Sequence, residues 1–163
     1  MNKIIFEPIG IVHSPFKEPK GTPIQPRKSG GAEGTIEIYE KYIPALDDLD
    51  GFSHIYLLFF LHLSKGYKLK VVPFLDNRER GLFATRAPRR PNQIGLSIVN
   101  LLRIEKNIMY IKDVDMLDGT PLLDIKPYVH SFDKQTDIKI GWLEDKAEAN
   151  KENRADNRFD DSK

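Results

Sequence analysis

The stretch 96-LSIVNLLRIEKNIMYIKDVDM-116 decides the fold of this 163-residue chain. It holds two runs of apolar and β-branched residues, 96–105 and 108–116, separated only by Lys106 and Asn107. Two strand-like runs joined by such a short polar turn predict a β-hairpin. The sequence therefore predicts a core built from neighbouring antiparallel strands.

Other short segments have the same strand-like composition, and the connections between them are rich in Gly and Pro. The expected strands are 4–13, 34–39, 52–63, 68–74, 82–86, 96–105, 108–116 and 122–128. Many short strands joined by Gly/Pro turns are typical of a closed sheet. The predicted fold class is mainly β: a small single-sheet β-barrel with short helices and long loops.

Individual segments refine this expectation. Pro8 predicts an edge or bulged strand at 4–13, because proline cannot donate to a ladder. The apolar run 52–63 is expected to be a central strand covered on both faces. A short helix is expected near 42–46, and 17–31 is expected to be a long loop.

Composition excludes several classes of protein. The chain has no cysteine, which rules out disulfides, thiolate catalysis and cysteine zinc sites and fits a reducing compartment. The N-terminus lacks the apolar core of a signal peptide, and the longest apolar run, 55–61, is too short to span a bilayer. A cytoplasmic protein with no membrane partner is expected. No strand–GxGxxG–helix unit occurs, so a Rossmann cofactor domain is not expected.

An arginine-rich loop lies between two of the expected strands. It carries Arg86, Arg89 and Arg90, and Pro88 and Pro91 stiffen it. Guanidinium groups bind phosphate and carboxylate in bidentate fashion and stack on bases. The loop therefore predicts an anion or RNA site, or else a surface loop paired with neighbouring carboxylates.

The segment Asp118-Gly119-Thr120 predicts a tight turn, which can also present polar groups to a small ligand. Four histidines occur, at positions 13, 54, 62 and 130, without the compact spacing of a metal site. We therefore expect no metal site, and histidines hydrogen-bonded within or beside the core.

Several ordered motifs in this chain resemble the TrmO (TsaA-like) family of tRNA adenine N(6)-methyltransferases. They are 9-IGIVHSPFK-17, 23-PIQ-25, 52-FSHIYLLFFLH-62, 81-GLFATRAPRRPNQIGLSIVNL-101 and 118-DGTPLLDIKPY-128. The resemblance spans residues 9–128. It implies a dimeric β-barrel methyltransferase domain, which we place over 1–143. The polar, charged composition of 144–163 predicts a tail that is helical or disordered.

The resemblance also implies a cofactor and a substrate. The cofactor would be S-adenosyl-L-methionine. The substrate would be N(6)-threonylcarbamoyl-adenosine, 3′ of the anticodon in threonine tRNAs, rather than DNA. The cofactor contacts that it implies are Pro23, Ile24, Gln25, His62, Leu63, Arg86, Leu96, Leu117, Asp118, Gly119 and Thr120.

Two positions depart from the family pattern. Ile24 stands where the family has arginine, and Arg27 is close enough in sequence to replace that cation. Gln93 stands where the family has a second proline, which would loosen the loop slightly.

For RNA contacts the sequence offers Arg27, Arg89 and Arg90. No residue is identified as the proton acceptor; His62 and Asp118 are candidates because both lie in cofactor motifs. Two alternatives stay open: a non-catalytic RNA-binding barrel, and a methyltransferase that acts on a small molecule.

Overall fold

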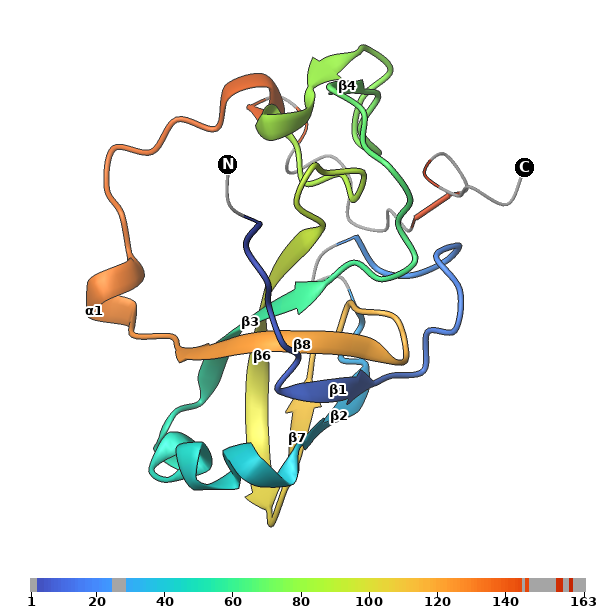
Figure 1. The fold of residues 1–163 in the computed structure, drawn as a ribbon. Coiled ribbons are helices and arrows are strands. Elements are labelled where there is room, and N and C mark those ends of the chain that lie inside the picture. Colours follow the sequence, from blue (N-terminus) through green and yellow to red (C-terminus); the bar gives the residue numbers. More distant parts are fainter. Residues whose placement is uncertain (1–2, 25–28, 145, 147–154, 157–158, 160–163) are drawn as a thin grey trace.

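The computed structural model describes residues 3–24, 29–144, 146, 155–156 and 159. Its centre is a closed antiparallel barrel with the strand order β1-β2-β7-β6-β3-β8 (Figure 1). The strands are β1 (Gly10–His13), β2 (Glu33–Ile38), β3 (His54–Phe60), β6 (Ile94–Glu105), β7 (Ile108–Lys112) and β8 (Thr120–Pro127). The predicted mainly β barrel is confirmed.

The barrel is filled by one face of each strand. On β3 the side chains of Ile55, Leu57 and Phe59 point inward and are buried, whereas those between them are only partly covered. This alternation follows from the two-residue period of a strand. The fully buried interior consists mainly of Val12, Ile36, Ile38, Ile55, Leu57, Val99, Met109, Ile111, Val114 and Leu122.

The hairpin that connects β6 to β7 forms as the sequence predicts. Glu105 pairs with Ile108, and Lys106 takes a positive φ of 57° in the turn between them. At the other side of the barrel, Gly10 lets β1 approach β2 closely. A Cβ at Gly10 would lie 2.4 Å from the carbonyl oxygen of Glu37, so any side chain there would push the two strands apart.

Three local predictions were wrong. The first strand begins at Gly10, after Pro8, rather than at residue 4. Residues 82–86 form a 3-10 helix, η4 (Leu82–Ala84), because both the backbone N–H and the hydroxyl of Thr85 bond to the carbonyl of Leu82. The strand expected to be covered on both faces leaves Phe60 38% exposed on its outer face, because the barrel buries only the inner face.

A smaller layer lies at the end of the barrel where β3 finishes and β6 begins (Figure 1). It contains the two-stranded sheet of β4 (Lys70–Val71) and β5 (Arg80–Gly81). Val71, Leu82 and Ala87 form its small core, and Phe159 packs against them. We call residues 64–93 the loop module.

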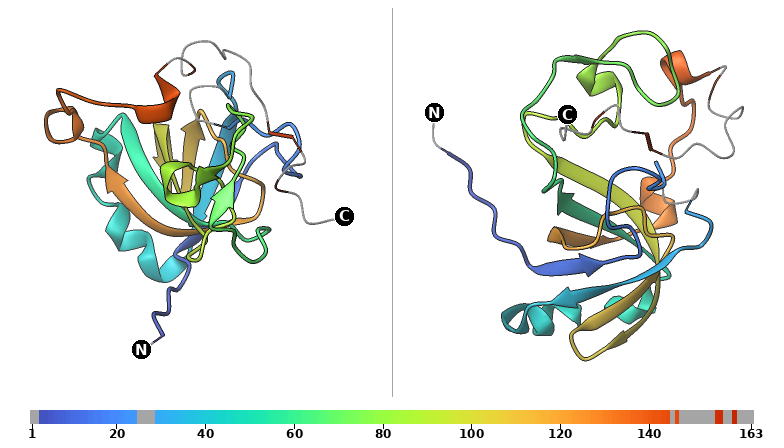
Figure 2. Two further views of the ribbon diagram at one scale, coloured as in Figure 1. Left: turned by 90° about the horizontal axis from the view of Figure 1, so that it is seen from above. Right: turned by 90° about the vertical axis from the view of Figure 1, so that its right-hand side faces the viewer.

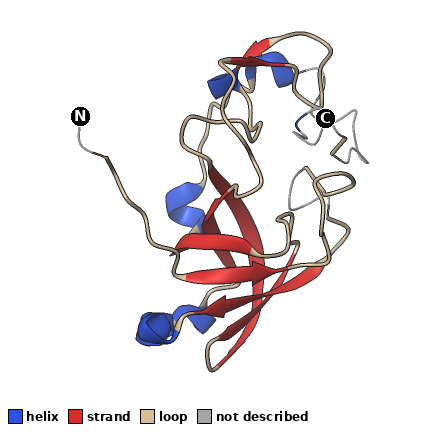
Figure 3. Ribbon diagram, turned by 45° about the vertical axis from the view of Figure 1, so that its right-hand side comes forward, coloured by secondary structure: helices blue, strands red, loops and turns tan. Residues whose placement is uncertain are grey.

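Residues near the C-terminus lie against this loop module (Figure 3). The indole N–H of Trp142, in η5 (Gly141–Leu143), donates to the carbonyl of Ala84 at 2.8 Å. Lys146 bonds to Asp76, and the rings of Phe74 and Phe159 meet edge to face at 5.0 Å. Trp142, Lys146 and Phe159 therefore contact the loop module, whereas most of the tail expected over 144–163 lies outside the described residues.

The opposite end of the barrel is covered by η2 (Glu40–Leu46) and η3 (Leu49–Gly51), so the helix expected near 42–46 is present. A short helix α1 (His130–Asp133) follows β8. The N-terminal arm runs away from the barrel (Figure 2), and Ile4, Ile5 and Phe6 are exposed on it. In the described part of the chain no helix has the length and apolar character needed to cross a bilayer.

Candidate active site

The turn Leu117–Thr120 is fixed to the end of β1 by backbone hydrogen bonds. The N–H of Asp118 donates to the carbonyl of Phe16 at 2.7 Å, and the N–H of Gly119 donates to the carbonyl of Val12 at 2.9 Å. Gly119 has a φ of +76°, and a Cβ there would meet nothing within 4 Å. The turn is therefore rigid, with open space beside it.

The carboxylate of Asp118 is used within the protein. It accepts the backbone N–H of Ser14 at 3.1 Å and pairs with Lys17 at 2.7 Å. His13 Nδ1 lies 3.7 Å from it. The pKa of Asp118 lies below its usual value, mainly because of the Lys17 ammonium and secondly because of the Ser14 N–H. Asp118 is thus a structural anchor and a weak proton acceptor.

His62 and Thr120 come from separate motifs and meet in the structure. His62 Nδ1 lies 3.5 Å from Thr120 Oγ1, and the Thr120 side chain is buried. Burial lowers the pKa of His62, although the Phe60 carbonyl opposes this effect. The imidazole is therefore neutral near pH 7 and presents a polar edge beside the turn.

A further carboxyl group, which the sequence did not single out, lies just before the turn. Asp115 accepts a hydrogen bond from the hydroxyl of Ser97 at 2.7 Å. Burial raises its pKa to about 6, while Ser97 and the charge of Arg86 oppose the shift. The alternation of Asp115 with buried Val114 and Met116 was the sequence signal that could have located it.

The three arginines of the arginine-rich loop are not equivalent. Arg86 is exposed and acts electrostatically on Asp115, which brings it to the end of the barrel that carries the turn. Arg90 is half-buried: it donates to the carbonyls of Thr85 at 3.1 Å and Ala87 at 3.4 Å. Its guanidinium also lies 5.7 Å from the ring centre of Phe83. Arg90 therefore holds the loop together.

Bonds to residues 64–68 add to the stiffness that the prolines provide. Ser64 Oγ donates to the carbonyl of Pro88 at 3.1 Å, and the N–H of Lys68 donates to the carbonyl of half-buried Arg89 at 3.3 Å. Gln93 Nε2 donates to the carbonyl of Ser64 at 2.8 Å. The loosening expected at Gln93 is therefore offset by its own side-chain bond.

The remaining predicted cofactor residues lie in two places. Leu63 and Leu96 are 49% and 53% exposed, and Leu96 pairs in register with Leu58 on the outer face of the barrel. Pro23 is buried and Ile24 half-buried in a loop that bonds to Ala155 through Gly21 and Thr22. Two predicted residues, Gln25 and Arg27, lie outside the described residues.

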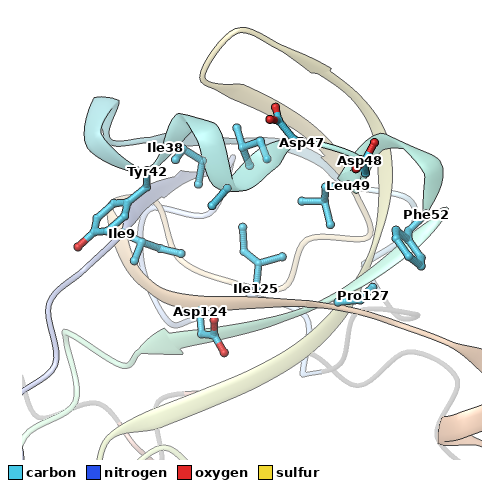
Figure 4. Close-up of a pocket in the computed structure, with 12 residues that line it drawn as sticks. Ile9, Ile38, Tyr42, Asp47, Asp48, Leu49, Phe52, Asp124, Ile125 and Pro127 are labelled. Atoms are coloured by element: carbon cyan, nitrogen blue, oxygen red, sulfur yellow. The ribbon is translucent and has the colours of Figure 1, made fainter.

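The structure also contains a pocket at the far end of the barrel, of about 420 Å³. Figure 4 shows its apolar walls, which include Ile9, Leu49 and Ile125, beneath η2 and η3. None of the described predicted site residues lines it. Among the residues that the structure describes, no group of three His, Asp or Glu side chains is arranged to hold a metal ion.

The chain is similar to known proteins over most of its length. Residues 11–134 match the model of the tRNA-methyltransferase O N-terminal domain. A "Probable S-adenosyl-L-methionine-binding protein" of Pyrococcus abyssi is 49% identical over 96% of this chain and 85% of that protein. The mouse tRNA (adenine(37)-N6)-methyltransferase is 38% identical over 84% of this chain but only 33% of that protein.

A solved structure agrees with this match. The crystal structure of TrmO from Pseudomonas aeruginosa superposes with a TM-score of 0.73 at 37% identity, over 86% of this chain. The chain spans 63% of the length of that structure. The likeness therefore covers the barrel and its site, whereas the rest of that protein has no counterpart in the match.

Proposed function

We propose that this chain, which belongs to the tRNA-methyltransferase O family, is an S-adenosyl-L-methionine-dependent methyltransferase that modifies N(6) of an adenine in tRNA. One observation carries the proposal. Three separate segments meet at one end of the barrel. They carry the turn Leu117–Thr120, His62, which lies beside Thr120, and Arg86, whose charge acts on Asp115 just before the turn.

The residues at this end of the barrel fit the cofactor chemically. Leu63 and Leu96 expose apolar surface suited to an adenine ring, and His62 and Thr120 offer polar atoms suited to a ribose. The open side of Gly119 leaves room for a ligand. When bound, S-adenosyl-L-methionine would supply an activated methyl group on a sulfonium with a good leaving group.

The role of this chain is then to position the acceptor and exclude water, which can lower a barrier by several kcal/mol. The turn is anchored to the β1 end by the backbone hydrogen bonds of Asp118 to Phe16 and of Gly119 to Val12, so it holds its shape before any ligand binds. The arginine-rich loop presents Arg86 to the cofactor and Arg89 to anticodon-loop phosphates, and Arg90 fixes the loop from inside. Loop bases can be splayed into a site without breaking a duplex.

For the substrate we propose N(6)-threonylcarbamoyl-adenosine of threonine tRNA, in the cytoplasm. The test is transfer of labelled methyl from S-adenosyl-L-methionine to tRNA with and without that modification. Label in modified tRNA alone is the expected result. Label in both tRNA pools would contradict the proposal that threonylcarbamoyl-adenosine is the substrate. Label in neither pool would contradict the proposed methyltransferase activity on tRNA.

We further propose a homodimer formed through the outer face of β3 and β6. Phe60, Leu96, Ile98 and Leu102 are each more than a third exposed on these adjacent strands. Because Leu96 belongs to the proposed cofactor site, a second copy would also cover that site. Light scattering should give twice the chain mass for the wild type and a monomer for Ile98→Asp. A monomeric wild type would contradict the dimer.

A further inference from the structure

Three carboxylates follow β7 in the segment 113–118, and two of them are held in place by the fold. Asp113 accepts Asn100 Nδ2 at 2.5 Å and Ser29 Oγ at 3.3 Å. Asp118 is paired with Lys17 and bonded to Ser14. Each of these two carboxylates already accepts hydrogen bonds from two protein groups, so fewer of its lone pairs are free to face a substrate.

Asp115 has a different environment. Its neighbours in sequence, Val114 and Met116, are buried in the barrel core, so the backbone at this position is fixed. The Ser97 hydroxyl donates to one of its oxygens at 2.7 Å and orients the carboxyl group. Among the charged side chains in the described part of the chain, Arg86 is the one that acts on it electrostatically.

The position of Asp115 also suits a role in the reaction. It lies three residues before Asp118 and bonds to Ser97, which is buried on the inner face of β6, opposite to the outer face that carries Leu96. Arg86 and the turn are both parts of the proposed cofactor site. Asp115 is therefore a half-buried carboxyl beside these two parts.

We propose that Asp115 accepts the N(6) proton of the adenine during methyl transfer and that Ser97 orients its carboxyl group for this role. This inference rests on the proposed function. In the step, a bond forms between N(6) and the methyl carbon, and the carbon–sulfur bond breaks with its electron pair going to sulfur. The N(6) proton goes to a carboxylate oxygen of Asp115.

The pKa of Asp115 agrees with its proposed role as the proton acceptor. A general base works best when its pKa lies near the working pH. Burial raises the pKa of Asp115 to about 6, so the group is ionised at pH 7 and still basic enough to accept a proton. The pKa of Asp118 is shifted in the opposite direction, by Lys17.

The first test compares Asp115→Asn with Asp113→Asn, its matched neighbour. Methyl transfer to modified tRNA, S-adenosylhomocysteine binding by calorimetry and tRNA binding are measured for both. We expect Asp115→Asn to lose about 100-fold or more in kcat and to keep both affinities within about threefold. Asp113→Asn should keep kcat within about threefold if it remains folded.

The second test is the pH profile. The wild-type kcat/KM should rise with pH through a midpoint near 6, and Ser97→Ala should move that midpoint upward because it removes a bond that favours the charged carboxylate. A carboxyl NMR titration should give the same midpoint without any turnover. His62→Gln serves as the comparison, because the neutral imidazole is the rival acceptor.

The outcomes separate the two proposals. An active wild type with an Asp115→Asn variant that retains most of its kcat overturns the role of Asp115 alone. Equal loss of S-adenosylhomocysteine affinity and kcat also overturns it, because Asp115 would then be a binding residue. If His62→Gln abolishes the pH profile and Asp115→Asn does not, His62 is the acceptor. A wild type that transfers no methyl group overturns both proposals.

Discussion

The carboxylate of Asp118 accepts the backbone N–H of Ser14 at 3.1 Å, although the two residues are 104 positions apart in the chain. This bond fastens the turn before β8 to the residue that follows β1. Ser14 is itself buried, and its hydroxyl donates to the carbonyl of Met116 at 2.7 Å. The turn is thus held from both sides, and Asp118 is part of that framework.

We therefore predict that Asp118→Ala lowers the free energy of unfolding by about 1–3 kcal/mol, because the Ser14 N–H loses its partner. Asp118→Asn keeps an acceptor oxygen and should cost less. Lys17→Ala removes only an exposed ion pair and should cost less than about 1 kcal/mol. Urea unfolding measures all three, and an Asp118→Ala variant as stable as Lys17→Ala would contradict the anchoring role.

The raised pKa of Asp115 predicts that its contribution to the free energy of unfolding changes with pH in the opposite direction to that of an ion-paired carboxylate. Its folded-state pKa is about 6, above the ordinary 3.8, so the folded state binds the proton more tightly than the unfolded state does. The stability that this group contributes is therefore present at low pH and is lost as pH rises from about 4 to about 6.

Relative to wild type, Asp115→Asn should gain stability between pH 4 and pH 7, by about 1–3 kcal/mol. Urea unfolding at several pH values gives the difference. A difference that does not change with pH would mean that the Asp115 carboxyl titrates normally. Such stabilisation, together with loss of activity, is the expected behaviour of a residue kept for function at a cost in stability.

The barrel was predictable because strand periodicity and the Gly- and Pro-rich turns between strands are local signals in the sequence. The hairpin across Lys106 and Asn107 is an example, since the residues that determine it are adjacent in sequence. The 3-10 helix Leu82–Ala84 was not predictable in the same way. Its apolar residues have strand composition, and what bends them is the Thr85 hydroxyl bonding back to Leu82.

Parts of the candidate site depended on tertiary contacts that a sequence pattern does not contain. The meeting of His62 with Thr120 joins residues 58 positions apart, and only the family motifs suggested that they share a site. Asp115 was missed because its burial and its bond to Ser97 of β6 are tertiary contacts; the alternation with Val114 and Met116 marks its place in the sequence but not its pKa. Likewise, nothing local shows that Arg90 is turned into its own loop.

The contacts of Trp142, the single tryptophan, hold the C-terminal region against the loop module. Its indole donates to Ala84, and the Arg80 guanidinium lies 5.3 Å from its ring centre. We expect Trp142→Ala to speed hydrogen exchange of the backbone amides of 80–87 by about tenfold, from the loss of about 1–2 kcal/mol of local stability.

Trp142→Phe is the matched control for this prediction, because it keeps a ring beneath Arg80 and removes the N–H donor. Its exchange rates should lie between those of the wild type and Trp142→Ala. The barrel amides of β7 should exchange equally in all three proteins. Unchanged exchange over 80–87 in Trp142→Ala would show that the loop module keeps its shape without this contact.

Arg86 and Arg90 provide a matched pair, because both lie in the same loop but only Arg90 bonds to the loop backbone. Arg90→Ala should speed hydrogen exchange over 84–90 and weaken S-adenosylhomocysteine and tRNA binding together. Arg86→Ala should leave exchange unchanged and weaken S-adenosylhomocysteine binding by about tenfold, as expected for one lost charge-assisted contact.

Arg86→Ala should also raise the pKa of Asp115, because the Arg86 charge opposes the upward shift. The midpoint of the wild-type pH profile should therefore move upward in Arg86→Ala. An Arg86→Ala variant with unchanged S-adenosylhomocysteine affinity and an unchanged pH midpoint would show that Arg86 faces neither the cofactor nor Asp115 in the working enzyme.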